Sequence, residues 1–66
     1  MRITVNGEPT EIGDGATVSD LIAQLGLAHA VCAAEVNNRV VPRGDRDRAP
    51  LADGDTVEIV TLVGGG

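Results

Sequence analysis

One short amphipathic segment restricts the folds open to this chain more than any other feature. In residues 14–27, DGATVSDLIAQLGL, Thr17 is placed to cap a helix, with Asp20 three residues later, and Gly26 is placed to end it. The apolar residues at one-face helical spacing are Val18, Leu21, Ile22 and Leu25. Two helical turns are not stable alone in water, so this helix must pack against a sheet.

Residues 2–12 predict the first two strands of that sheet, because apolar and polar residues alternate with the period of a strand. Asn6 and Gly7 form a strong two-residue turn signal, since both tolerate positive φ. Pro9 has no N–H to donate, so the second strand is expected at a sheet edge. The residues expected to face the core are Ile3, Val5 and Ile12.

A second pair of strands is predicted after the helix. Residues 31–36 are small and nearly all apolar, and Asn37 and Asn38 form the turn that follows. Residues 40–41 then form a short strand, which Pro42 ends.

Residues 44–55 are expected to be a polar surface connection anchored to the core by Leu51, and the DGD sequence at 53–55 forms a tight turn through its aspartates. Residues 56–63 give the strongest strand signal in the chain. Their apolar residues lie on both faces: Val57 and Ile59 on one, Val60 and Leu62 on the other. A strand of this kind is either central in its sheet or presents one face to a partner.

The order strand, strand, helix, strand, strand, strand predicts a two-layer α+β domain, with one helix packed on one face of a mixed four- to five-stranded sheet. Among small folds this order suits the ubiquitin-like β-grasp. We expect residues 1–62 to form the β-grasp domain and residues 63–66 to be a flexible glycine-rich tail.

The charge balance restricts the partners. The formal net charge is −5, there is no lysine, and four of the five arginines fall within residues 39–48. Binding to nucleic acid rests on Lys and Arg at phosphates, so nucleic acid and anionic membranes are disfavoured, while a basic protein partner is favoured.

Location is predicted from the cysteine count and the apolar runs. Cys32 is the sole cysteine, which excludes an internal disulfide and fits a reducing cytosol. The chain opens on MRITVNG without an apolar signal region, and no apolar run approaches the ~20 residues of a membrane span. We therefore expect a cytoplasmic protein.

Conventional catalysis lacks its usual residues. His29 and Cys32 lie three apart at a strand entry, which directs their side chains to opposite faces, so a loop histidine and a buried cysteine are favoured over a catalytic pair. One Cys and one His are too few for a zinc site, and residues 53–59 lack the pattern of a calcium loop. We expect no catalytic residue, no metal site and no bound cofactor.

The remaining candidate is the terminal Gly64-Gly65-Gly66. An expression scar or a frayed end would make these glycines dispensable. The functional alternative is that the carboxylate of Gly66 is the reactive group. Residues 63–66 can extend by at most ~14 Å, and glycine fits a narrow channel because it has no Cβ. A partner enzyme could then adenylate this carboxylate with ATP, and a persulfide could convert it to a thiocarboxylate.

Four stretches resemble the ThiS family of bacterial sulfur carriers, which are ubiquitin-like β-grasp proteins: ITVNGEP, DGATVSDLIAQLGL, AEVNNRVVPR and LADGDTVEIVTLVGGG. Their order, the chain length and the terminal glycines carry the resemblance together. It implies that a ThiF-type, E1-like adenylyltransferase adenylates Gly66 using ATP, that a persulfide donor supplies the sulfur, and that a ThiG-type thiazole synthase receives it for thiamine. Gly64 and Gly65 would thread into partner active sites, and Val60, Leu62 and Val63 would form the docking surface.

Close alternatives share the fold. A carrier that supplies sulfur to molybdopterin or to cysteine, and a non-covalent β-grasp interaction module, both stay open at this point. The terminal glycines separate the two classes, because a carrier needs the Gly66 carboxylate and an interaction module does not.

Overall fold

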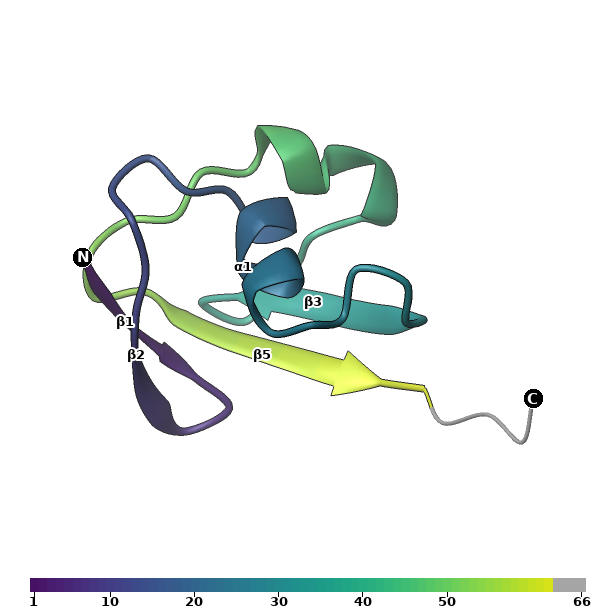
Figure 1. Cartoon of the computed structure of the whole chain (residues 1–66), viewed down its shortest axis with the longest axis horizontal. Helices are drawn as coiled ribbons and strands as arrows, with labels where there is room; N and C mark the ends of the chain where they lie inside the picture. The colour runs from purple at the N-terminus through teal and green to yellow at the C-terminus, as the bar shows by residue number, and fades with distance from the viewer. Residues whose placement is uncertain (63–66) are drawn as a thin grey trace.

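The computed structural model describes residues 1–62, in which five strands, one α-helix and one 3-10 helix are found (Figure 1). The elements are β1 (Arg2–Val5), β2 (Glu8–Glu11), α1 (Val18–Gln24), β3 (Cys32–Val36), β4 (Arg39–Val40), η1 (Arg43–Arg48) and β5 (Thr56–Thr61). The strands form one mixed sheet in the order β2-β1-β5-β3-β4. The predicted α+β architecture is confirmed, with the sheet at the upper end of the expected strand number.

Both predicted hairpins are present, and their turns explain their register. Asn6 and Gly7, between the antiparallel β1 and β2, have φ of 51° and 84°. Asn37 and Asn38, between the antiparallel β3 and β4, have φ of 51° and 68°. Positive φ at both central residues matches the right-handed twist of the flanking strands. The second strand lies at the edge of the sheet, as Pro9 predicted.

The last strand is central, as its two apolar faces predicted. β5 pairs in parallel with β1 and antiparallel with β3, and it places Val57 and Ile59 in the core. The strand ends at Thr61, and the backbone N–H of Leu62 donates to the Val31 oxygen over 2.9 Å.

The helix begins and ends as predicted, but one residue of its apolar stripe is not buried. Thr17 and Asp20 form a reciprocal capping box: the Asp20 N–H donates to the Thr17 hydroxyl, and the Thr17 N–H donates to the Asp20 carboxylate. Gly26 ends the helix with φ of 78°. The expectation that Leu25 faces the core is wrong: it is the C-cap residue, from which the chain leaves the helix through Gly26, and its side chain is 38% exposed.

The segment predicted as a polar connection contains a helix that the sequence pattern missed. η1 begins after Pro42, whose carbonyl accepts from the Asp45 N–H over 2.8 Å, and it has no buried residue. Its side chains carry no apolar period, so periodicity gave no signal. Leu51, beyond it, is buried as expected.

Two predicted strand bounds are corrected by one residue each. β3 begins at Cys32, which leaves Val31 57% exposed, and β4 comprises Arg39–Val40 where residues 40–41 were expected. Strand ends are the least well determined part of such patterns.

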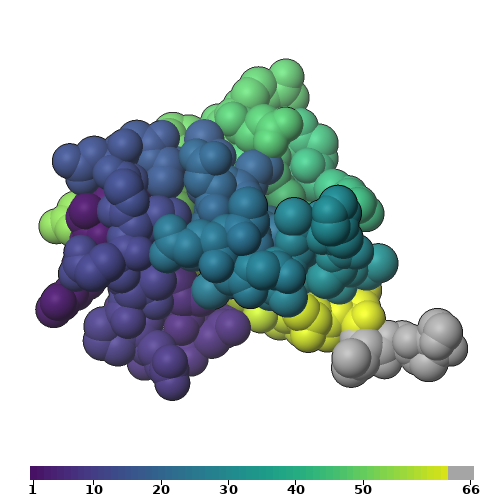
Figure 2. Space-filling model, in the orientation of Figure 1, coloured from purple at the N-terminus to yellow at the C-terminus, as the bar shows by residue number. Residues whose placement is uncertain are grey.

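The core lies between the sheet and α1, and it contains aliphatic side chains with one cysteine. Its members are Ile3, Val5, Ile12, Ala16, Val18, Leu21, Ile22, Cys32, Ala34, Leu51, Val57 and Ile59. Both helices lie on the same side of the sheet (Figure 1), and in the space-filling view β5 is visible as a yellow strip below the blue and teal atoms of α1 and the segment that follows it (Figure 2). Within residues 1–62, no helix has the length and apolar character to cross a membrane.

Candidate partner-docking face

β5 separates its side chains sharply between the two faces of the sheet. Val57 and Ile59 are 0% and 5% exposed, whereas Val60 and Leu62 are 51% and 61% exposed. The alternation predicted from the sequence is confirmed, and two of the proposed docking residues therefore lie on the face opposite the helices.

Neighbouring strands extend this exposed surface with residues that the sequence pattern alone did not single out. Ala33 lies directly opposite Val60 in the β3–β5 pairing, and Val40, at 69% exposed, lies opposite Glu35 in the β3–β4 pairing. We call this surface the open face; its residues are Ala33, Glu35, Val40, Glu58, Val60 and Leu62.

The signal for these residues was present in the sequence. Alternation along residues 32–36 places Ala33 and Glu35 on one face. A two-residue turn at Asn37 and Asn38 then pairs residue 40 with residue 35. The register between β3 and β5 could not be predicted from the sequence pattern.

That register places two acidic residues opposite one another. Glu35 and Glu58 are Cα partners in the β3–β5 ladder and project from the same face. Glu35 is half-buried and Glu58 is exposed. Within residues 1–62, neither carboxylate takes part in a hydrogen bond or an ion pair. The centre of the open face therefore carries concentrated negative charge.

A side-chain clamp holds the second half of β5 in place. The ladder with β1 covers only Thr56 and Val57 of this strand. Beyond this ladder, the Asn6 side chain makes the hydrogen bonds that a neighbouring strand would otherwise make. Its Oδ1 accepts from the Ile59 N–H over 2.9 Å, and its Nδ2 donates to the Ile59 oxygen over 3.1 Å. These bonds satisfy backbone groups that would otherwise lack partners on that side.

The start of β5 is fastened to β1 by the predicted turn. The Asp53 carboxylate accepts from the Arg2 N–H over 2.8 Å, and the Asp55 carboxylate accepts from the Ala52 N–H over 2.8 Å. Gly54 adopts φ of 88° between them. The turn role expected of these aspartates is confirmed.

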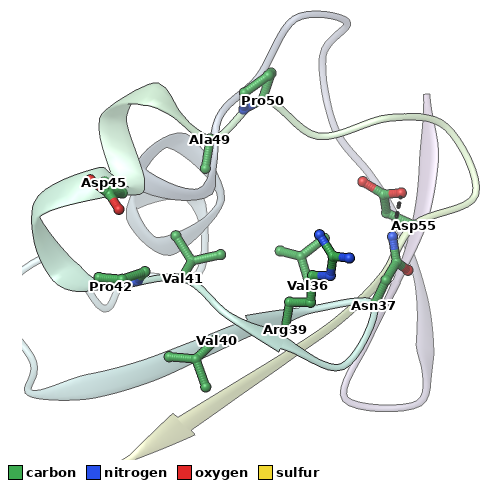
Figure 3. A pocket seen from close by; sticks show the side chains of 10 residues that line it. All are labelled: Val36, Asn37, Arg39, Val40, Val41, Pro42, Asp45, Ala49, Pro50 and Asp55. Carbon is green, nitrogen blue, oxygen red and sulfur yellow. Dashed lines mark hydrogen bonds between the residues drawn. The ribbon is translucent and has the colours of Figure 1, made fainter.

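A surface groove lies on the other side of β4 and does not include the predicted docking residues (Figure 3). Arg39 points into it beside Val36, while Val40 points away from it. Asn37 at its rim donates to Asp55 over 3.0 Å and accepts from the Thr56 N–H over 3.0 Å. These bonds tie the β3–β4 turn to the start of β5.

The structure separates the two residues weighed as a catalytic pair. Cys32 is buried, and its backbone oxygen and Sγ both accept from the guanidinium of Arg46. His29 is exposed in a turn. No cluster of three or more metal-ligating side chains occurs within residues 1–62.

The tail residues proposed for function lie outside the described part of the chain. They are Val63, Gly64, Gly65 and Gly66.

One family model and several known proteins are similar to this chain. The ThiS family model matches residues 3–66. The sulfur carrier protein ThiS of Escherichia coli (strain K12) is 30% identical over the full length of both chains. The molybdopterin synthase sulfur carrier subunit of Chlamydomonas reinhardtii is 36% identical, with 94% of this chain and 81% of that protein covered.

A longer relative contains a similar stretch. A thiazole synthase of Magnetococcus marinus is 39% identical over all of this chain, which spans only 20% of that protein's length.

Among solved structures, the crystal structure of the thiamine biosynthesis protein ThiS from Geobacter metallireducens superposes with a TM-score of 0.84 and 35% sequence identity, covering all of both chains. This likeness confirms the predicted ubiquitin-like β-grasp fold, in which one helix packs on a mixed five-stranded sheet.

Proposed function

Because this chain belongs to the ThiS family of sulfur carriers, we propose that it carries sulfur on the C-terminal carboxylate of Gly66 for the thiazole ring of thiamine. The observation that supports this most is the extent of the family match, which runs through the terminal glycines to residue 66. The chain acts as a protein substrate in the cytoplasm, and the catalytic groups, together with ATP, belong to its partners.

The chemistry takes two stages. In the first, a carboxylate oxygen of Gly66 attacks the α-phosphorus of ATP in a ThiF-type, E1-like adenylyltransferase, and pyrophosphate leaves. In the second, a persulfide sulfur attacks the activated carbonyl carbon, and AMP leaves. A thiol then breaks the sulfur–sulfur bond of this adduct, which leaves a thiocarboxylate on Gly66 and a disulfide on the donor.

The residue types at the chain end suit these steps. Gly64 and Gly65 have no Cβ, so they fit a narrow channel that leads to a partner's active site. Val60, Leu62 and Val63 contact the partner's surface at the mouth of that channel. In this arrangement the partner recognises the folded domain, and the reaction takes place at the carbonyl carbon of Gly66.

Delivery to a ThiG-type thiazole synthase is supported by the longer relatives. A stretch similar to the whole of this chain lies within proteins named thiazole synthase, from Magnetococcus marinus among others. Joining two modules in one chain raises their effective concentration for one another, which favours modules that act together.

The test is intact-mass spectrometry of the full chain after incubation with the E1-like enzyme, ATP and a persulfide donor. We expect a gain that matches replacement of one oxygen by sulfur. A variant that lacks Gly66 should keep its fold and show no gain. Sulfur gain by the truncated chain, or none by the full chain, would contradict the proposal.

A second candidate is sulfur supply to molybdopterin, which the similarity to the Chlamydomonas reinhardtii carrier subunit favours. Deletion of the gene distinguishes the two. Growth restored by added thiazole supports the thiamine pathway, whereas loss of molybdenum-enzyme activity without a need for thiazole supports the second candidate.

A further inference from the structure

The open face contains an arrangement that works against the stability of the fold. Glu35 and Glu58 lie directly opposite each other, where Cβ atoms in an antiparallel pair are ~4.5–5.5 Å apart. Like charges at this spacing repel, and the repulsion is added to a chain with a net charge of −5. Within residues 1–62 no cation relieves it.

The surroundings of the pair are apolar. Val40 lies opposite Glu35, Val60 follows Glu58 on the same face, and Ala33 lies opposite Val60. A protein surface that covers these side chains removes water from the two carboxylates. Electrostatic attraction is stronger in such a site than in open water, so a cation supplied by that surface would be bound well.

We propose that the open face docks the E1-like activating enzyme through an apolar surface with a lysine or arginine at its centre, whose cation binds between Glu35 and Glu58. This rests on the proposed function and assigns the partner's chemistry at the site. Apolar contacts to Val40, Val60 and Leu62 surround that ion pair.

Charge complementarity favours a basic protein surface over a second copy of this chain, nucleic acid or an anionic lipid surface. A second copy of this chain, docked through the same face, would bring two glutamate pairs together. Nucleic acid and anionic lipid surfaces carry the same sign of charge as the pair. A basic protein surface removes the repulsion and buries the exposed valines.

The position of the face fits the role. Glu58 and Val60 lie on β5, and Leu62, which follows the last residue of that strand, directly precedes the proposed tail in the sequence. At ~3.3 Å per residue, Glu58 is about 13 Å from Leu62 along an extended chain. An enzyme that binds the glutamate pair therefore also contacts the strand that leads toward Gly66.

The experiment compares Glu35→Gln, Glu58→Gln and the double variant with the full natural chain. Pyrophosphate exchange by the E1-like enzyme gives KM and kcat for each, and urea denaturation gives their stability. We expect the double variant to have a higher urea midpoint, a KM about tenfold higher and an unchanged kcat. After one substitution removes the repulsion, the second should add little further stability.

Glu8→Gln is the matched control. Glu8 is exposed on β2, at the far edge of the sheet, and its substitution changes the net charge by the same amount as either single substitution, Glu35→Gln or Glu58→Gln. We expect its KM to stay close to that of the natural chain. A similar rise in KM for Glu8→Gln would show that only net charge matters, and would overturn the proposed site.

The remaining outcomes are distinct. Exchange by the natural chain with an unchanged KM in the double variant would overturn the inference and leave the proposed function standing. No exchange by the natural chain would overturn the proposed function and, with it, the named occupant. A dimer that forms through this face, detected by light scattering and absent in the double variant, would also overturn the inference.

Discussion

At the scale of single residues, Asn6 has a role in a turn and a second role in the sheet. Its backbone, at φ of 51°, makes the β1–β2 turn, and its amide bonds both backbone groups of Ile59. The two residues are 53 positions apart in the sequence. Asn6 therefore joins the first turn to the strand that bears the open face.

We predict that Asn6→Gly lowers the free energy of unfolding by about 1–3 kcal/mol. Glycine keeps the positive φ but leaves the Ile59 N–H and C=O without partners on that side. Urea denaturation followed by circular dichroism measures the change.

Asn38→Gly is the control, because Asn38 also has positive φ, at 68°, and its side chain takes part in no hydrogen bond within residues 1–62. Both substitutions increase the conformational entropy of the unfolded chain by the same amount, since each replaces Asn by Gly. Equal losses in both variants would show that the Asn6 amide contributes nothing.

At the scale of elements, α1 depends on its cap more than a longer helix would. It has 7 residues, too few to persist without tertiary contacts, and it holds Val18, Leu21 and Ile22 against the sheet. The capping box satisfies backbone N–H groups at the end where the chain enters from the Gly13–Gly15 loop.

We predict that Thr17→Ala destabilises the protein by about 1 kcal/mol. The substitution removes the hydroxyl that accepts from the Asp20 N–H. Thermal denaturation gives the shift in midpoint, and Ser19→Ala, within the same helix, serves as the comparison. Ser19 makes no hydrogen bond through its side chain in the described region, so its substitution should be neutral or slightly stabilising. A neutral Thr17→Ala would mean that the cap is dispensable.

η1 is held in place by a contact with β3, and its own sequence has no apolar periodicity that predicts a helix. Its residues have no apolar face, but Arg46 reaches across to the backbone oxygen of Cys32 at the start of β3. That contact fastens the connection to the sheet. Periodicity could not have predicted it, because the bond depends on a distant strand being in place.

At the scale of the whole molecule, charge and fold act together. The net charge is −5, and the arginines gather mainly within residues 39–48. The open face carries Glu35 and Glu58 and no positive residue. A basic partner is therefore attracted to the molecule as a whole and oriented toward this face.

We predict that docking to the E1-like enzyme slows as salt rises, because the Debye length shortens to ~8 Å at 0.15 M ionic strength. Stopped-flow measurement of the association rate constant over a range of NaCl concentrations checks this, with the dissociation rate constant expected to change less. Association that is independent of salt would contradict the prediction and would indicate docking through Val60 and Leu62 alone.

The features that depend on neighbours in the chain could be predicted from the sequence alone. Asn6-Gly7 and Asn37-Asn38 require positive φ, Thr17 caps the helix that follows it, and alternation along residues 56–62 separates Ile59 from Val60. Each of these rests on backbone sterics or on hydrogen bonds within a few residues. The terminal glycines and the family resemblance also came from sequence.

Contacts between residues far apart in the sequence depend on the packing of the whole domain. The register of β3 against β5 set Glu35 opposite Glu58, and the end of the β1 ladder left Ile59 to the side chain of Asn6. Leu25 has the right spacing, but it caps the end of the helix and its side chain is 38% exposed. Such outcomes depend on how whole elements pack. The same alternation would be kept by any register shifted by two residues, and the local pattern therefore cannot choose among them.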